Sequence, residues 1–127
     1  MKAGWTVSGE VVHGRRLGRE LGFPTANIDA EGLQTDCGDG VYASQVEFRG
    51  QLYGAMSNLG RRPTVGGTHR LLETHLFGFS GDLYGQKIRV RLLQKIRGEE
   101  HYPTVDELQR SIERDAETIK DIIANRY

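Results

Sequence analysis

The stretch from Val41 to Phe48 reads VYASQVEF and is followed directly by Arg49 and Gly50. Its odd positions carry V, A, Q and E and its even positions Y, S, V and F, which is the alternation with a period of two that is typical of a β-strand. An Arg-Gly pair after such a run is typical of a hairpin turn. The stretch therefore predicts a strand that turns back at residues 49 and 50 onto a second strand.

Five further runs have the composition of strands, namely residues 7–12, 25–28, 52–57, 71–79 and 85–96. A second turn is expected at residues 80–82, where the sequence is Ser-Gly-Asp. Six short strands separated by glycine turns favour a closed antiparallel barrel, because closure removes the exposed edges of a small sheet. We expect this all-β barrel to span about residues 5–98.

The segment after the barrel predicts a helix over about residues 104–125. Residues 104–107 read TVDE, the form of a capping box, in which we expect the Thr104 oxygen and the Glu107 carboxylate to satisfy amides at the helix start. An apolar stripe that can pack on the barrel follows, consisting of Leu108, Ile112, Ala116, Ile119 and Ile123. Residues 1–127 are thus expected to form a single domain.

The charge balance excludes several classes of protein. The 127 residues carry 17 Lys and Arg against 17 Asp and Glu, so the chain lacks the surplus positive charge of a sequence-independent nucleic-acid binder or a polybasic membrane-surface protein. It has no apolar run long enough to span a membrane and no apolar signal segment at its start. With one cysteine and no metal-ligand spacing among its four histidines, it is expected to be cytoplasmic and to lack a zinc site.

Residues 14–22 read GRRLGRELG and interleave three glycines with three arginines. Backbone amides that turn inward and guanidinium groups that neutralise an anion could together cradle a phosphate. The spacing matches neither the Walker A loop nor the dinucleotide-binding fingerprint. From spacing alone, a basic surface loop is the alternative.

Pro24 makes the chain leave this loop in an extended conformation, which places Thr25 and Asn27 on the same side of a strand. A hydroxyl and an amide oxygen beyond a basic glycine loop are hard neutral ligands suited to Mg²⁺. The alternative is that both side chains bond to turn backbone.

Glu73 is the candidate proton acceptor. Strand periodicity places it on one face with Leu71, His75, Phe77 and Phe79. A carboxylate among apolar neighbours is partly desolvated, which makes it a better base near neutral pH. The alternatives are an exposed strand residue or one paired with an arginine. The neighbouring His75 is expected to be a packed, hydrogen-bonded histidine. Residues 57–68 are expected to form a glycine-rich binding loop or flap.

Four segments together resemble the riboflavin kinases (flavokinases), specifically the kinase module at the C-terminal end of bacterial bifunctional riboflavin kinase/FAD synthetases. They occur in the family's order over nearly the whole chain: residues 11–14 with 17–19 and 21–27, the last of which ends in PTAN; residues 58–64 (NLGRRPT); residues 73–77 (ETHLF); and residues 82–85 (DLYG) with 96–97.

The resemblance implies a six-stranded Greek-key β-barrel with a C-terminal helix, and transfer of the ATP γ-phosphoryl group to the riboflavin 5′-hydroxyl, giving FMN and ADP. It implies that Thr25 and Asn27 hold Mg²⁺ and the nucleotide phosphates and that Glu73 is the base. The other implied ATP or ADP contacts are Gly14, Gly18, Arg19, Leu83, Tyr84 and Gly85. The implied riboflavin or FMN contacts are Gly66, Arg70, Leu72, Arg97 and Glu100. An apolar slot near Phe77, Phe79 or Tyr102 would suit the flavin ring.

The family's synthetase domain carries an H-x-G-H type motif that this sequence lacks. We therefore expect no conversion of FMN to FAD by this chain, and an FAD synthetase (nucleotidyltransferase) domain is a partner to expect in a parent protein. The alternative function is a non-catalytic split-barrel protein that binds FMN. That alternative would need neither a metal nor a phosphate cradle.

Overall fold

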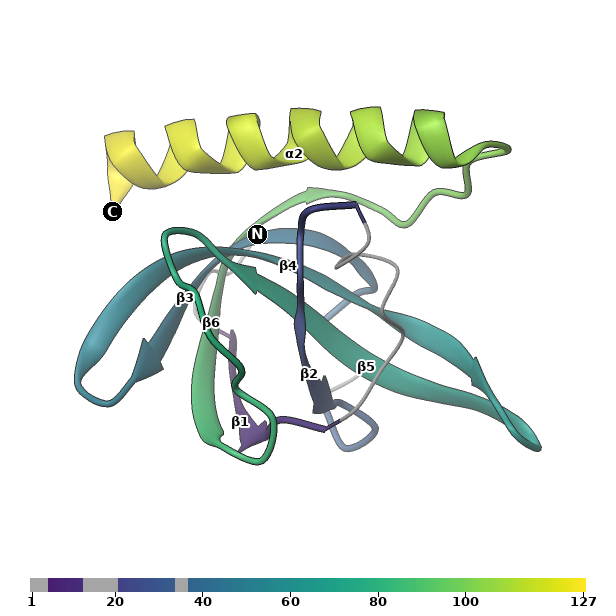
Figure 1. The fold of residues 1–127 in the computed structure, drawn as a ribbon, viewed down its shortest axis with the longest axis horizontal. Coiled ribbons are helices and arrows are strands. Elements are labelled where there is room, and N and C mark those ends of the chain that lie inside the picture. Colours follow the sequence, from purple (N-terminus) through teal and green to yellow (C-terminus); the bar gives the residue numbers. More distant parts are fainter. Residues whose placement is uncertain (1–4, 13–20, 34–36) are drawn as a thin grey trace.

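The computed structural model describes residues 5–12, 21–33 and 37–127 of the chain (Figure 1). The helix and strands in chain order are β1 (Trp5–Glu10), β2 (Ala26–Asp29), β3 (Gly40–Phe48), β4 (Gln51–Thr64), β5 (Gly67–Leu76), β6 (Lys87–Arg97) and α2 (Val105–Arg126).

The six strands form one antiparallel sheet in the order β1-β6-β3-β4-β5-β2. Its two edges approach each other where the Val12 amide donates to the Asn27 carbonyl over 2.8 Å, so the sheet is a nearly closed barrel. β6 returns beside β3 after the β3-β4-β5 meander, which is the Greek-key arrangement. The predicted fold class is confirmed.

The hairpin predicted at residues 49 and 50 is confirmed. Phe48 pairs with Gln51, and both central residues have positive φ, 51° at Arg49 and 76° at Gly50. Two consecutive positive φ values define the type I′ turn, whose twist matches that of the flanking strands.

Residues 57–68 are not the loop that their composition suggests. β4 continues to Thr64, and residues 61–64 pair with residues 67–70 of β5, so that Val65 and Gly66 alone form the turn. Figure 1 shows this hairpin extending beyond the body of the barrel. The predicted flap is therefore a two-stranded extension, in which alternate side chains point to opposite faces.

The turn predicted at residues 80–82 joins β5 to β6, but these strands are not hairpin partners. β6 pairs with β1 and β3 instead. Residues 77–86 therefore cross from one side of the barrel to the other.

The barrel interior is apolar apart from a chain of hydroxyl groups. Fully buried side chains such as Ile28, Leu59 and Leu72 fill it. Between them, the Oγ atom of Ser57 lies 2.7 Å from that of Ser44 and 2.8 Å from Oγ1 of Thr74. These three strand residues satisfy one another, which is how polar groups are accommodated inside a core.

Helix α2 covers the outer surface of the barrel (Figure 1). Its C-terminal half packs there through Ile119, which is fully buried with Val41 and Ala43. Thr104 is the N-cap and accepts from the Glu107 amide as predicted. The Glu107 carboxylate, however, accepts from the Thr104 hydroxyl rather than from a backbone amide. No helix in the described part of the chain is long and apolar enough to cross a membrane.

We expect Thr74→Val to lower the free energy of unfolding by about 1 kcal/mol, because it removes one of the two hydrogen bonds to the buried Ser57 hydroxyl without changing side-chain volume. The measurement is urea-induced unfolding. Thr68→Val, on the exposed part of the same strand, is the matched control and should change stability by less than about 0.5 kcal/mol. Equal effects of the two substitutions would contradict a stabilising role for the hydroxyl chain.

Candidate active site

A row of paired residues crosses five strands on the outer face of the barrel. Asn27 lies opposite Glu73, Glu73 opposite Asn58, and Asn58 opposite Val41, which in turn lies opposite Arg97. Directly paired residues of antiparallel strands project to the same face with Cβ atoms about 4.5–5.5 Å apart. The register alone therefore gathers two amides, a carboxylate and a guanidinium on one surface.

An irregularity in β6 brings Arg97 into this row. Val41 pairs with Arg97, but the next residue, Tyr42, pairs with Lys95, so Ile96 is skipped. A β-bulge of this kind redirects side chains, because a shift of one residue exchanges the two faces of a strand. Without it, Ile96 would lie opposite Val41.

A cavity of about 150 Å³ lies between this row and the N-terminal half of α2. Its lining comprises Phe23, Thr25, Val41, Met56, Asn58, Arg62, Glu73, His75, Arg97, Glu100, Tyr102, Leu108, Ile112 and Asp115. Among the predicted site residues, it brings together Thr25, Glu73, Arg97 and Glu100. The apolar stripe of the helix is thus divided, since its first two residues line the cavity while Ile119 packs on the sheet.

Glu73 is held by an arginine. The Oε1 atom of Glu73 accepts from Nε of Arg62 over 2.9 Å and lies 2.8 Å from its Nη2. The Glu73 side chain is 13% exposed, and the Arg62 side chain is 8% exposed. Burial opposes the charge on Arg62, but Glu73 and Glu99 together raise the pKa of the guanidinium above its ordinary value. The carboxylate therefore lies beside a cation and not simply among apolar neighbours.

Arg97 joins the barrel to the helix across the cavity. Its Nη2 lies 2.7 Å from Oδ2 of Asp115 and donates to Oγ of Ser111 over 3.1 Å. Burial opposes the charge on Arg97, but the pair with Asp115 raises the pKa of the guanidinium. Ser111 in turn donates to the Tyr102 hydroxyl over 2.6 Å, which anchors one wall of the cavity. Of the three aromatic residues expected near a flavin, Tyr102 is the one that lines this cavity.

Asn27 carries a buried amide oxygen without a partner among the described residues. Its side chain is 5% exposed, and within the described residues its Oδ1 atom has no hydrogen-bond partner. Leaving a buried amide oxygen unpaired costs about 1–3 kcal/mol, so a ligand or cation that satisfies it would gain that energy. Asn27 and the nearby Thr25 offer neutral oxygen atoms, and these fit Mg²⁺.

The Nδ1 atom of His75 lies 2.8 Å from the Pro24 carbonyl oxygen, just before β2. This contact confirms that His75 is a packed, hydrogen-bonded histidine.

The segment Leu83–Gly85 lies beside the strand that leads into the glycine loop. Leu83 is buried in the barrel core, and the Gly85 amide donates to the Val11 carbonyl over 2.9 Å. Tyr84 is half exposed. The predicted loop residues Gly14, Gly18 and Arg19 lie outside the described residues.

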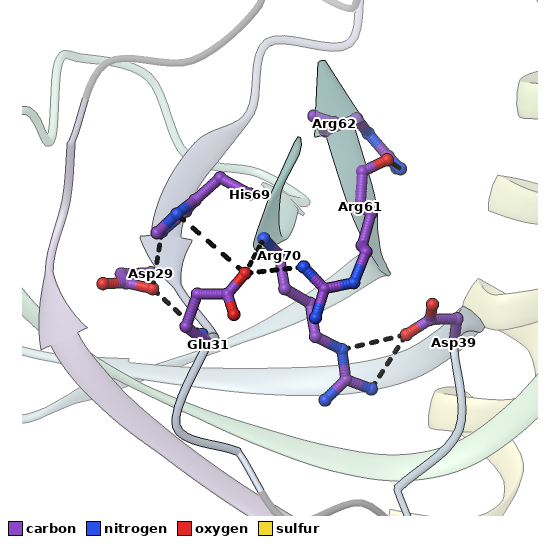
Figure 2. A network of polar contacts seen from close by, with 7 residues as sticks. All are labelled: Asp29, Glu31, Asp39, Arg61, Arg62, His69 and Arg70. Carbon is purple, nitrogen blue, oxygen red and sulfur yellow. Dashed lines mark hydrogen bonds and ion pairs between the residues drawn. The ribbon is translucent and has the colours of Figure 1, made fainter. Parts of the chain in front are cut away.

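Three predicted flavin contacts lie away from the cavity. Leu72 is fully buried inside the barrel, and Gly66 lies at the tip of the β4-β5 hairpin. Arg70 belongs to a surface network, in which it donates to Oδ1 of Asp39 over 2.8 Å (Figure 2).

The surface network in Figure 2 ties the hairpin to the turn after β2. Glu31 accepts from the Arg70 amide and from Arg61, and the Oδ1 atom of Asp29 accepts from the Glu31 amide and contacts His69. These contacts lower the pKa of Glu31, chiefly through the Arg70 amide. Arg61 and Arg62, although adjacent, thus serve opposite faces of one strand.

Asn58 and Arg62 are site residues that the sequence reasoning did not single out. Both line the cavity, and the Oδ1 atom of Asn58 is buried without a partner in the described part of the chain. The available signal was strand alternation, which places residues 58, 60 and 62 on one face. It was missed because this segment was interpreted as a loop.

We expect Asp115→Asn to lower the free energy of unfolding by about 1–3 kcal/mol, because it removes the charge that compensates the partly buried Arg97. Asp121→Asn is a matched control at an exposed position of the same helix and should have little effect. Urea unfolding of both variants measures the difference. Similar stabilities would show that the pair does not hold the helix on the barrel.

Comparisons with known proteins agree with this geometry. The family model described as "Flavokinase: Riboflavin kinase" matches residues 1–123. A bifunctional riboflavin kinase/FMN adenylyltransferase of Haemophilus influenzae is 44% identical over 117 residues, which make up 91% of this chain and 38% of that protein. An RNA-binding riboflavin kinase of Bacillus subtilis is 41% identical over 86% of this chain and 47% of its own length.

Among solved structures, a riboflavin kinase of Trypanosoma brucei superposes with a TM-score of 0.64 at 22% identity, covering 98% of this chain and 83% of that one. This likeness supports the fold alone. The chain spans less than half the length of the two curated relatives described above. The match to the family model and the identity to the Haemophilus protein over nearly all of the chain show that it belongs to the riboflavin kinase (flavokinase) family.

Proposed function

We propose that this chain is a riboflavin kinase, which transfers the γ-phosphoryl group of ATP to the 5′-hydroxyl of riboflavin and releases FMN and ADP. The observation that carries the proposal is the row on the outer face, where the carboxylate of Glu73 lies between the amides of Asn27 and Asn58 beside a partly apolar cavity. The arrangement thus places a candidate base next to oxygen atoms that could bind a metal and next to a cavity that could hold a ring system.

In the proposed reaction, the oxygen of the 5′-hydroxyl bonds to the γ-phosphorus while the bond from that phosphorus to the bridging oxygen of ADP breaks. The hydroxyl proton passes to the carboxylate of Glu73. Both Arg62 contacts fall on Oε1 of Glu73, and in the described residues Oε2 has no hydrogen-bond partner, so Oε2 is the oxygen that takes the proton. Proton transfer of this kind contributes about 10²–10⁴-fold to a rate.

Thr25 and Asn27 would hold Mg²⁺ together with the nucleotide phosphates. The ion would neutralise phosphate charge, which is a principal requirement of phosphoryl transfer. The buried and unpaired Oδ1 of Asn27 supports this role. We assign the remaining nucleotide contacts to Gly14, Gly18, Arg19 and the segment Leu83–Gly85, because the Gly85 amide bonds to Val11, which precedes the loop in the sequence.

Riboflavin would enter the cavity between the sheet and α2, where Arg97, Glu100 and Tyr102 line the wall. The volume of about 150 Å³ is below the roughly 300–1,000 Å³ of typical small-molecule sites. The cavity must therefore widen to admit an isoalloxazine ring. Gly66, Arg70 and Leu72 would act at a distance, by shaping the β4-β5 hairpin.

The proposed protein is a kinase module with small-molecule substrates and no FMN adenylyltransferase activity of its own. Its curated relatives join such a module to a second activity, so we propose an adenylyltransferase domain as its partner in a longer protein. The RNA binding named for the Bacillus relative is not proposed here, because this chain has no net positive charge.

We expect the chain to convert riboflavin, ATP and Mg²⁺ to FMN and ADP in equal amounts, as measured by chromatography. Glu73→Gln should lower kcat by about 10²–10⁴-fold while leaving the KM for ATP within about twofold, because the amide cannot accept the proton. Glu47→Gln, at an exposed pair with Arg89, is the matched control. Flavin binding without FMN formation would instead favour a non-catalytic FMN-binding protein.

We expect Asn27→Leu to abolish the Mg²⁺-dependent part of ADP binding, as measured by calorimetry with and without the ion. Leucine has a similar size but no oxygen, so the free energy of unfolding without ligand should be unchanged or higher. ADP binding that responds to Mg²⁺ as in the wild type would remove Asn27 from the metal site.

A further inference from the structure

Arg62 connects the candidate base to a second carboxylate. Its Nη2 atom lies 2.8 Å from Oε1 of Glu73 and 3.0 Å from Oε2 of Glu99. The Arg62 side chain is 8% exposed, whereas that of Glu99 is 31% exposed. One buried cation is thus shared between a carboxylate on β5 and a carboxylate in the segment that follows β6.

The backbone is shaped to permit this contact. Gly60 lies two residues before Arg62 on the same face of β4, and a Cβ atom at Gly60 would overlap the Glu99 carboxylate and come within 2.6 Å of Nη1 of Arg62. Arg62 also donates from Nη1 to the carbonyl of Arg61 over 3.0 Å, which fixes the plane of the guanidinium. These contacts show a built site rather than a chance surface pair.

The charges of the three groups explain why two carboxylates are present. With both carboxylates ionised, the group has a net charge of −1, and it becomes neutral when Glu73 takes up a proton. A buried guanidinium that lost its only partner would be costly. Glu99 lies 3.0 Å from Arg62 and is not the proton acceptor, so Arg62 keeps a carboxylate partner before and after the proton transfer.

We propose that Arg62 is a positioning residue, which holds the Glu73 carboxylate by Oε1 so that Oε2 faces the acceptor hydroxyl, and that Glu99 retains Arg62 in place when Glu73 becomes protonated. The proposal rests on the proposed kinase function and assigns a role to a pair that touches no reacting atom. Orientation of this kind matters because a displacement of about 1 Å in a reacting group can cost about 10²-fold in rate.

The proposal is tested with Arg62→Met in the full chain, by steady-state kinetics of FMN formation. We expect kcat to fall by about 10–100-fold while the KM values for ATP and riboflavin stay within about twofold, because the mostly buried Arg62 acts through the Glu73 carboxylate. Glu99→Gln should lower kcat by a smaller factor, about 3–10-fold. Arg62→Lys, which keeps the charge, should restore part of the kcat that Arg62→Met loses.

The matched control is Arg61→Met. It changes the same residue type at the adjacent position, but its partner is Glu31 on the opposite face, and it should leave kcat unchanged. Unfolding in urea, measured for each variant, tests whether the folded fraction in the assay is the same. A loss of kcat in Arg61→Met as large as that in Arg62→Met would overturn the proposal.

A double-mutant cycle separates positioning from general support of the structure. If Arg62 acts through Glu73, then adding Arg62→Met to Glu73→Gln should cause no further loss of kcat, since the base is already absent. Independent, multiplicative losses would overturn the role of Arg62 and leave the base assignment intact. Unchanged kcat in Glu73→Gln alone would remove both the base and the positioning role, while FMN formation by the wild type would still support the kinase function.

Discussion

The antiparallel register of β2, β5 and β4 is the constraint on which the site depends. It places Asn27, Glu73 and Asn58 directly opposite one another, so three polar side chains from distant parts of the sequence meet without any loop to arrange them. Their neighbours along each strand, including Ile28, Leu72 and Leu59, point into the barrel and are almost completely buried. A slip of one residue would bury the polar row and expose the core, so the packing of the interior enforces the geometry of the site.

Helix α2 turns this polar surface into a cavity. The C-terminal half of the helix adheres to the sheet through Ile119, whereas Leu108 and Ile112 in its first half line a space. Arg97 bridges that space to Asp115 and Ser111. Within the site, both arginines have carboxylate partners, while the Oδ1 atoms of Asn27 and Asn58 lack partners among the described residues. Charges are thus compensated by the protein, and the unpaired amide oxygens remain for a ligand.

The helix and most strands could be predicted from local patterns, because turns, caps and alternation depend on residues that are close in the sequence. The type I′ turn needs two positive φ values, of which Gly50 accepts one readily, whereas Arg49 adopts the other as a non-glycine residue. The helix was predicted to within one residue at each end from its cap and stripe. Residues 57–68 were wrongly interpreted as a loop, because glycine, proline and consecutive arginines are poor strand formers. Pairing with residues 67–70 outweighs those preferences, and the error concealed Arg62.

Periodicity and short motifs, which are properties of neighbouring residues, were sufficient to predict most of the strands, the helix, the family and the candidacy of Thr25, Asn27 and Glu73. Which of these candidates lie together depends on the tertiary structure. A bulge in β6 brings Arg97 into the row, whereas Leu72 lies in the core and Arg70 in the network of Figure 2. Arg62 and Glu99 lie beside the candidate base. The physical reason is that such contacts depend on strand register and on the charge balance of buried groups, and both are set by residues far apart in the chain.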